Sequence, residues 1–360
     1  RRNDFSAAPH PAPDDELRIR QPRVARRRQR PAALVPARGL LAPAGGSEGT
    51  DRGRFVHFAR RDRPAVIDIE VALDEVATKV NVMLDRLLQP VADPEGRVVE
   101  AMRYAALGGG KRLRPFLVIA SARLFGVAEE SALRTAAAIE LLHCYSLIHD
   151  DLPAMDNSDM RRGRAAVHKQ FDEATAILAG DALLTLAFEV LAHPATHSDP
   201  RVRADLVLEL ARAAGAAGMV GGQMLDLLAE HAALDIGAIT RLQRLKTGEL
   251  IAFSCAAGAL LGHGPPQARQ ALHNFAHDLG LAFQITDDLL DAEGSAALLG
   301  KPVGHDRAAG KATFVSILGL ERAREQAELL ARQAVQHLDF FDESADLLRA
   351  VPGFVIARRR

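Results

Sequence analysis

Cysteine is scarce in this sequence, and its scarcity excludes two classes of protein. Only Cys144 and Cys255 occur in 360 residues, which is too few for a disulfide framework, and no Cys-x-x-Cys pair indicates a zinc site. Both cysteines lie in apolar, helix-like segments, so we expect buried thiols. A signal peptide is not evident, because the front of the chain lacks a continuous apolar segment. We therefore expect a cytoplasmic protein in a reducing compartment.

Long hydrophobic runs are also missing. We find no apolar run of the roughly 18 residues that a membrane-spanning helix needs, and the uncharged stretch 250–261 is short and rich in Ala and Gly. We expect no stable insertion into a membrane. The phosphate-binding pattern GxxxxGK[ST] does not occur, which disfavours a nucleotide kinase.

The net charge hides a strong asymmetry. The chain has 45 Lys+Arg and 46 Asp+Glu, a formal net charge of −1. Residues 1–63 contain 15 Arg, no Lys and 7 acids, giving +8, so the other 297 residues carry 30 basic and 39 acidic residues, giving −9. An acidic body argues against nucleic acid as a partner. With 48% hydrophobic residues overall, the chain can bury a sizeable core.

Residues 1–63 are expected to be a disordered, basic extension, followed by one helical domain over 64–360. The extension holds 7 of the 18 prolines and an arginine-rich run at 26–30, a composition that does not build a core. A nucleic-acid or membrane-binding arm and an organelle transit peptide are alternatives, and acids at 14–16 count against the second. Since no Met precedes Met83, we favour a dispensable extension, part of it translated upstream sequence.

From about residue 66 the pattern is helical. Apolar residues recur at spacings of three and four, as in Leu133, Ala137 and Leu141, and we expect no strands. Pro352 is expected to interrupt the last helix. The sequence predicts an all-α, single-domain bundle of about ten or more helices around a central cavity. The predicted helices are 66–88, 95–108, 114–125, 130–150, 171–192, 200–217, 219–229, 236–259, 266–290 and 310–336.

Two acidic clusters are the strongest chemical signal. Each follows a long apolar helix, the first with Asp150, Asp151 and Asp156, the second with Asp287, Asp288 and Asp291. At about 100° per residue the three acids of the second cluster share one helical face, whereas those of the first do not. Pro153 explains the difference, because it ends the helix near residue 151 and lets residue 156 return from a loop.

Crowded carboxylates at a helix C-terminus repel one another and oppose the helix dipole. A solvated acidic face explains one such cluster, but two clusters without Lys partners four residues on favour a bound cation. Oxygen ligands suit Mg²⁺, which is commonly held by one or two carboxylates together with substrate phosphates. We therefore predict Mg²⁺ and a phosphorylated substrate.

Basic residues suited to phosphate accompany the acids. Three glycines precede Lys111, Arg112 and Arg114 at a predicted helix start, where backbone N–H groups and basic side chains bind anions. Each basic segment alone is a weak signal, because a solvated helix cap has the same composition. Other basic residues stand in short Gly-containing segments, namely Arg161, Arg162, Lys246, Lys301 and Lys311.

In order and spacing these segments resemble the trans-isoprenyl diphosphate synthases, and among them the bacterial farnesyl diphosphate synthases. The resemblance covers about residues 66–350, and its motifs are highly specific in combination. It rests on GGKRLRP (109–115), HCYSLIHDDLPAMD (143–156), RRG (161–163), ILAGDALLT (177–185), GGQMLD (221–226), KTG (246–248), FQITDDLLD (283–291) and GKAT (310–313).

The resemblance implies a prenyltransferase that joins isopentenyl diphosphate to an allylic diphosphate with Mg²⁺, three ions per site, which Mn²⁺ can replace. It also implies a homodimer. Six residues form the implied catalytic set: Asp150, Asp151, Lys246, Thr247, Gln284 and Asp287.

The implied ligand contacts divide into four groups. The metal ligands are Asp150, Asp151, Asp156, Asp287, Asp288 and Asp291, with Asp288 and Asp291 acting partly through water. The allylic diphosphate meets Arg161, Lys246 and Lys301, and the isopentenyl diphosphate meets Gly110, Lys111, Arg114, His143 and Arg162. Thr247 and Gln284 stabilise the allyl cation, and Lys311 closes the site.

Product length is expected to depend on the helix before the first acidic cluster. Tyr145 and Ser146 precede Asp150 by five and four residues, about 7.5 and 6 Å along the axis. In the resemblance an aromatic residue there, with the Leu-Pro insertion, indicates the C15 product farnesyl diphosphate. A geranylgeranyl diphosphate synthase is the main alternative. A terpene cyclase is disfavoured by the second Asp-Asp-x-x-Asp, and a non-catalytic subunit of a heteromeric synthase by two intact clusters.

Overall fold

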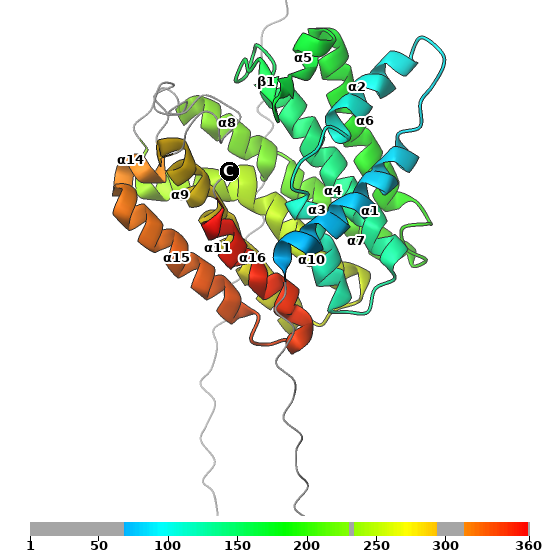
Figure 1. The fold of residues 1–360 in the computed structure, drawn as a ribbon. Helices are drawn as coiled ribbons and strands as arrows, with labels where there is room; N and C mark the ends of the chain where they lie inside the picture. Colours follow the sequence, from blue (N-terminus) through cyan, green and yellow to red (C-terminus); the bar gives the residue numbers. More distant parts are fainter. Residues whose placement is uncertain (1–67, 230–233, 294–312, 359–360) are drawn as a thin grey trace, which may run out of the picture. The chain divides into compact units, whose positions relative to one another are not determined.

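The computed structural model describes residues 68–229, 234–293 and 313–358, which belong to one compact unit. This part is helical nearly throughout, which confirms the all-α prediction (Figure 1). The predicted extension 1–63 lies outside the described residues. The helices are α1 (Ile69–Leu87), α2 (Gly96–Ala106), α3 (Leu113–Arg123), α4 (Glu129–Asp150), α5 (Val167–Gln170), α6 (Glu173–Ala192), α7 (Pro200–Ala214), α8 (Met219–Ala229), α9 (Ile236–Gln243), α10 (Glu249–Leu261), α11 (Pro266–Glu293), α14 (Phe314–Leu318), α15 (Leu320–His337) and α16 (Asp346–Ala357), with a π-turn η1 (Arg244–Gly248) and a 3₁₀ turn η2 (Glu343–Ala345).

Aspartates begin several of these helices. The side chains of Asp68, Asp172 and Asp235 accept hydrogen bonds from first-turn backbone N–H groups of α1, α6 and α9. Asp199 does the same for α7, whose first residue is Pro200. Such caps satisfy N–H groups that have no partner within the helix, and proline is tolerated there because its missing N–H would be unpaired anyway.

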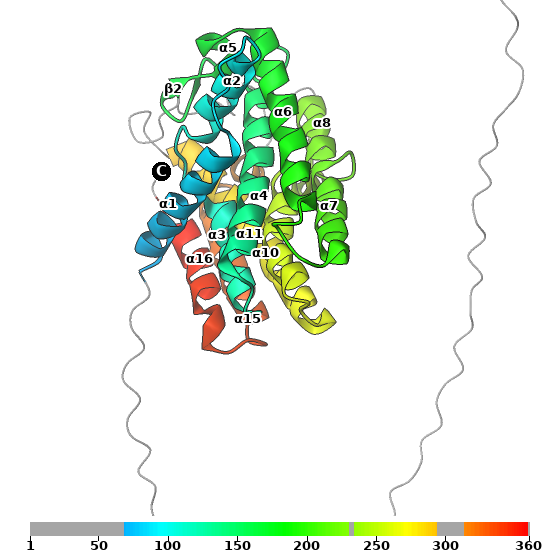
Figure 2. The same ribbon diagram turned by 90° about the vertical axis from the view of Figure 1, so that its right-hand side faces the viewer.

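Helix α4 lies between α3 and α6 at the centre of the bundle (Figure 2). Helix α10 packs against α3, α7 and α11, and α15 packs along α11. The main apolar core includes the fully buried Phe116, Ile139 and Phe275. A smaller cluster around Phe314 joins α9, α11, α14 and α15. Since α4 and α11 carry the two acidic clusters, this packing determines how those clusters face each other.

One strand pair departs from the prediction. The short strands β1 (Met160–Arg161) and β2 (Arg164–Ala165) form an antiparallel hairpin. Its two turn residues, Arg162 and Gly163, both have positive φ, as the tightest hairpins require. Two-residue strands carry no detectable alternation, which is why the pattern did not indicate them.

Three helix boundaries also differ. The predicted helix 236–259 is divided by η1, where the bonding pattern widens by one residue. The predicted helix 310–336 is divided at Gly319, which has φ 80°. Pro352 does not interrupt the last helix: α16 continues through it, held by the buried Leu348 and Val355 on either side.

Helix α6 is the one described helix long and apolar enough, by length and composition, to cross a membrane. This differs from the expectation from the sequence, in which no apolar run is that long. Within the fold α6 packs against α2, α4 and α7, and its residues Ala179, Leu183 and Leu191 belong to the main core. This packing accounts for part of its apolar composition, and one such helix is weak evidence for a membrane span.

Candidate active site

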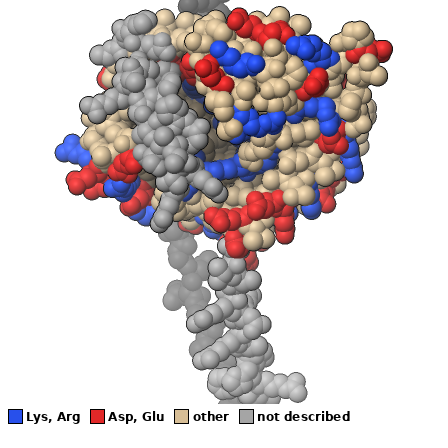
Figure 3. Space-filling model, turned by 45° about the horizontal axis from the view of Figure 1, so that its top comes forward, with Lys and Arg blue, Asp and Glu red and all other residues tan. Residues whose placement is uncertain are grey.

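A cavity of about 640 Å³ opens between α4, α8, η1, α10 and α11, where the sequence predicts a central cavity. Figure 3 shows Lys and Arg side chains gathered around a hollow on one face of the molecule. The cavity lining is mainly apolar with polar groups at intervals. Its polar members are Arg114, His143, Ser146, His149, Asp150, Gln223, Lys246, Thr247, Gln284 and Asp287.

The first acidic cluster lies where α4 ends. Asp150 is the last residue of α4 and Asp151 its C-cap. The backbone N–H of Asp156 donates to the carbonyl oxygen of Asp150 at 2.9 Å, which confirms that residue 156 returns from a loop. Burial raises the pKa of Asp150 to about 6, with Lys246 opposing the rise and Asp156 adding to it. A bound cation would therefore stabilise the charged form of this carboxylate.

Asp151 turns away from the cavity toward the hairpin. Its side chain is 3% exposed and accepts hydrogen bonds from Arg161, with Nε 3.0 and 3.1 Å from the two carboxylate oxygens. Because Arg161 belongs to β1, the hairpin carries this arginine to the end of α4. The structure thus joins two predicted site residues, but on the wall of a small side pocket next to the main cavity.

Of the second cluster, only Asp287 is among the described residues that line the cavity. Its Oδ1 accepts a 2.8 Å hydrogen bond from Arg358 Nη2. Asp288 and Asp291 are buried, at 4% and 5% exposure, because α14 and α15 pack on α11 there. The predicted shared helical face therefore does not give shared exposure to the cavity.

A chain of hydrogen bonds connects the predicted cation-stabilising residues to Asp288. Thr247 Oγ1 donates to Gln284 Oε1 at 3.2 Å, and Gln284 Nε2 donates to Asp288 Oδ1 at 3.2 Å. The other Asp288 oxygen accepts from the backbone N–H of Phe314 at 2.8 Å. This chain fixes the Gln284 amide, so its oxygen and that of Thr247 lie together on the cavity wall.

The π-turn η1 presents Lys246 and Thr247 to the cavity. Lys246 Nζ donates to Asp226 Oδ2 at 2.7 Å. Helix α8 approaches the backbone of η1 closely: a β-carbon on Gly222 would lie 2.2 Å from the backbone nitrogen of Lys246. π-Turns within α-helices are frequent at functional sites, and here the widened turn sets the register of two polar side chains.

A second pocket, of about 330 Å³, adjoins the cavity and is cationic. It shares Arg114, His143 and Phe283 with the cavity lining. Burial, reinforced by Arg114 and Arg162, holds the pKa of His143 well below its usual range, so the imidazole is neutral. His143 Nε2 lies 3.4 Å from Arg114 Nη1; since a guanidinium only donates, Nε2 is the acceptor. The pocket's basic residues are Lys111, Arg112, Arg114, Arg162 and Arg358.

The oxygen donors near the cavity fit the predicted Mg²⁺ only together with a substrate. Within the described residues no group of three or more His, Cys, Asp and Glu side chains is close enough to enclose a metal ion. The available donors are carboxylates on two sides of one cavity, and Oδ1 of Asp291 is buried without a hydrogen-bond partner. This arrangement fits an ion that is bridged by a substrate's phosphates better than one held by protein alone.

The remaining predicted site residues fall into three groups. Tyr145 and Ser146 line the cavity as expected. Gly110 lies in the cationic pocket at φ 123°, a conformation that favours glycine. Lys301 and Lys311 lie outside the described residues.

The polar residues of the site that were not predicted include His149 and Gln223 of the cavity lining, together with Asp226, Glu140 and Arg358. Asp226 stands in the GGQMLD segment, where its spacing from Lys246 gives no hint of contact. Glu140 precedes His143 by three residues on α4, a helical spacing that could have pointed to it. Arg358 reaches the site only through the packing of α16 beside α11.

Comparison with known proteins agrees with this geometry. The polyprenyl synthetase family profile matches residues 95–347. The chain is 44% identical to the farnesyl diphosphate synthase of Escherichia coli, over 82% of this chain and 100% of that protein. It is 40% identical to a putative chloroplastic geranylgeranyl pyrophosphate synthase of Arabidopsis thaliana, over 90% of each.

A solved structure shows the same fold. The crystal structure of an FPP/GFPP synthase from Zymomonas mobilis, in its apo form, superposes with a TM-score of 0.74 at 49% identity. It covers 80% of this chain and 99% of that one. The profile match, the identities and the shared fold together establish that this chain belongs to the polyprenyl synthetase family.

Proposed function

We propose that this protein is an Mg²⁺-dependent prenyltransferase that joins isopentenyl diphosphate head-to-tail to dimethylallyl or geranyl diphosphate, giving farnesyl diphosphate. One observation carries the proposal: an apolar cavity bounded by Asp150 and Asp287 shares a wall with a cationic pocket. Such a pair of sites suits two diphosphates, one bound with metal and one bound without it.

The allylic substrate is assigned to the apolar cavity. Mg²⁺, or Mn²⁺ in its place, would be held by Asp150, Asp151, Asp156, Asp287, Asp288 and Asp291, three ions per site, with the buried Asp288 and Asp291 acting partly through water. The bound metal would neutralise the negative charge that grows on the leaving diphosphate as its C–O bond breaks. On the protein side, Arg161, Lys246 and Lys301 contact the same diphosphate.

The allyl cation is left facing the cavity wall. The side-chain oxygens of Thr247 and Gln284, fixed by their mutual hydrogen bond, are the negative ends of two dipoles and face the cation. The apolar lining, which includes Leu152 and Met219, excludes water that would capture the cation. The chain thereby stabilises the cation by fixed dipoles without offering a nucleophile.

Isopentenyl diphosphate is assigned to the cationic pocket. Gly110, Lys111, Arg114, His143 and Arg162 hold its diphosphate without a metal, so its own C–O bond stays intact. Its double bond attacks the allyl cation where the two pockets adjoin, and a proton is lost to the departing diphosphate. The neutral His143 donates or accepts a hydrogen bond and adds no charge.

The test is incubation of purified protein with Mg²⁺, isopentenyl diphosphate and geranyl diphosphate, followed by chromatography of the products. Farnesyl diphosphate and released pyrophosphate support the proposal. A C20 product would assign the protein as a geranylgeranyl diphosphate synthase, an alternative favoured by the Arabidopsis relative. No prenyl product would favour a non-catalytic subunit.

A homodimer and a cytoplasmic location belong to the same proposal. Exposed apolar side chains that line neither pocket occur on two helices that both contact α7: Ile177 and Leu178 on α6, and Leu228 on α8. Apolar exposure of this extent typically marks a protein interface. We assign this face to contact with a second copy of the chain.

A further inference from the structure

One buried carboxylate beside the cationic pocket takes no part in the proposed chemistry. Glu140 lies on α4, three residues before His143, and is 2% exposed. It precedes Asp150 by ten residues, about 15 Å along the helix axis, so it lies far from the first acidic cluster. A buried acid is costly unless it is paired, and its partners therefore indicate its purpose.

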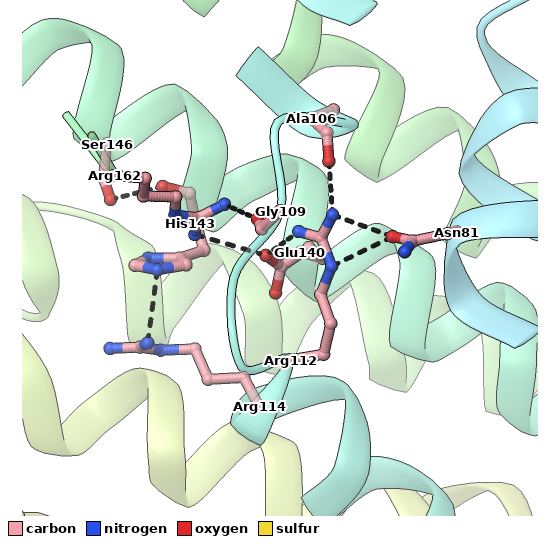
Figure 4. Close-up of polar contacts among 9 residues, drawn as sticks. All are labelled: Asn81, Ala106, Gly109, Arg112, Arg114, Glu140, His143, Ser146 and Arg162. Atoms are coloured by element: carbon pink, nitrogen blue, oxygen red, sulfur yellow. Dashed lines mark hydrogen bonds and ion pairs between the residues drawn. The ribbon is translucent and has the colours of Figure 1, made fainter. Parts of the chain in front are cut away.

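Glu140 pairs with two arginines (Figure 4). Arg112 Nη1 donates to Glu140 Oε1 at 2.5 Å, and Arg162 Nη2 lies 3.7 Å from the same oxygen. The fully buried Arg112 also donates to Asn81 Oδ1 at 2.8 and 3.1 Å and to the Ala106 carbonyl oxygen at 2.6 Å. Its guanidinium is thus committed to protein acceptors and is fixed in place.

Arg162 is held from a second side. Its Nη1 donates to the carbonyl oxygen of Gly109. A β-carbon on the next residue, Gly110, would lie 2.7 Å from the guanidinium carbon, so glycine is needed for Arg162 to occupy this place. Arg162 is therefore clamped between the glycine loop and Glu140.

The pocket's charge explains why a carboxylate is needed. Among the described lining residues, Glu140 is the one acid facing the five basic side chains. Converging guanidinium groups repel each other, and they do so more strongly where water is excluded. A single carboxylate reduces this repulsion yet leaves the excess positive charge that a diphosphate requires.

We propose that Glu140 is a positioning residue, which pairs with Arg112 and Arg162 and so holds the cationic pocket ready for a metal-free diphosphate. The inference rests on the proposed function, in which that diphosphate belongs to isopentenyl diphosphate. Glu140 acts through the arginines and does not touch the substrate.

The test compares the KM values for isopentenyl and geranyl diphosphate in the wild type and in Glu140→Gln. We expect the KM for isopentenyl diphosphate to rise about tenfold, while the KM for geranyl diphosphate and kcat change less than threefold. A change in the ratio of the two KM values of fivefold or more supports the proposal. A smaller change in that ratio overturns it, because a general loss of structure affects both substrates alike.

Two further variants separate positioning from folding. Since Glu140→Gln leaves a buried arginine unpaired, which destabilises strongly, the double variant Arg112→Met/Glu140→Gln removes both charges. We expect its thermal midpoint to recover while the KM ratio stays altered, because Arg162 still lacks its partner. Asp278→Asn is the matched control: this acid pairs with His337 at 3.0 Å, outside both pockets, and its loss should leave the KM ratio unchanged.

The two levels of proposal fail in different ways. If the wild type yields no prenyl product, the proposed function fails. If the wild type is active and the folded double variant keeps the wild-type KM ratio, the role assigned to Glu140 is wrong and the proposed function stands. Calorimetric titration of isopentenyl diphosphate in the presence of EDTA gives the same comparison without catalysis, with an expected tenfold weaker binding in the double variant.

Discussion

Tyr145, five residues before Asp150, lines the cavity. Its ring packs edge-on against the imidazole of His149, with ring centroids 5.0 Å apart. Tyr145→Ala removes this wall, so we expect a growing prenyl chain to extend further along α4 and C20 or longer products to replace part of the C15 product. Chromatography of products made from isopentenyl and geranyl diphosphate is the measurement. Tyr104→Phe, outside the cavity lining, is the control; an unaltered product length in Tyr145→Ala would contradict this role.

Gly222 permits the close approach of α8 to the π-turn. Because a β-carbon there would lie 2.2 Å from the backbone nitrogen of Lys246, Gly222→Ala must displace η1 and the side chains that η1 presents to the cavity. We expect kcat to fall at least tenfold, since small misplacements of catalytic groups cost about a hundredfold in rate. Steady-state kinetics measures this. Gly353→Ala, where a β-carbon meets nothing within 4 Å, should retain wild-type kcat.

At the scale of elements, the start of α6 depends on Asp172. Its carboxylate accepts from the Thr175 backbone N–H at 2.7 Å and from Arg97 at 2.9 Å. The Thr175 backbone bond, aided by Arg97 and the Thr175 hydroxyl, lowers the pKa of Asp172 to about 2. This stabilisation is complete above the unfolded-state pKa of about 3.9 and is lost as pH falls toward 2.

We therefore expect Asp172→Ala to lower the thermal midpoint by roughly a few degrees at pH 7. The difference from the wild type should shrink as the pH is lowered from about 4 toward 2. Thermal denaturation followed by circular dichroism across this range is the measurement. Asp205→Ala, which removes an exposed acid from α7, serves as the control, and a difference independent of pH would argue against the carboxylate cap.

At the scale of the whole molecule, the proposed contact with a second copy rests on exposed apolar side chains of α6 and α8. Leu178 is 54% exposed and Leu228 59%. A charge placed on this face would be buried at the proposed interface without a counter-charge, so we expect Leu178→Glu/Leu228→Glu to be monomeric in sedimentation or light-scattering measurements. Val71→Glu, at an equally exposed position on α1, should leave the dimer intact; a wild-type monomer would refute the interface.

Local signals in the sequence were enough for the fold class and for the acidic end of α4. Helical spacing and the helix-ending effect of Pro153 act within one or two turns, so they can be recognised directly in the sequence. The π-turn at Lys246 and the hairpin at Arg161 were missed, because each involves only a few residues and is stabilised by distant packing. The sequence predicts one helical face for the second cluster, but it gave no sign that α14 and α15 bury Asp288 and Asp291 while Asp287 lines the cavity.

What the sequence determined by itself was the chemistry: two sets of carboxylates, basic glycine loops, and an all-helical scaffold to carry them. What only the tertiary structure decided was which groups meet. It joins Asp151 to Arg161, Lys246 to Asp226, and Glu140 to Arg112 and Arg162. Residue types and helical periods are properties of the local chain, whereas these pairings arise when helices remote in sequence pack around a common core.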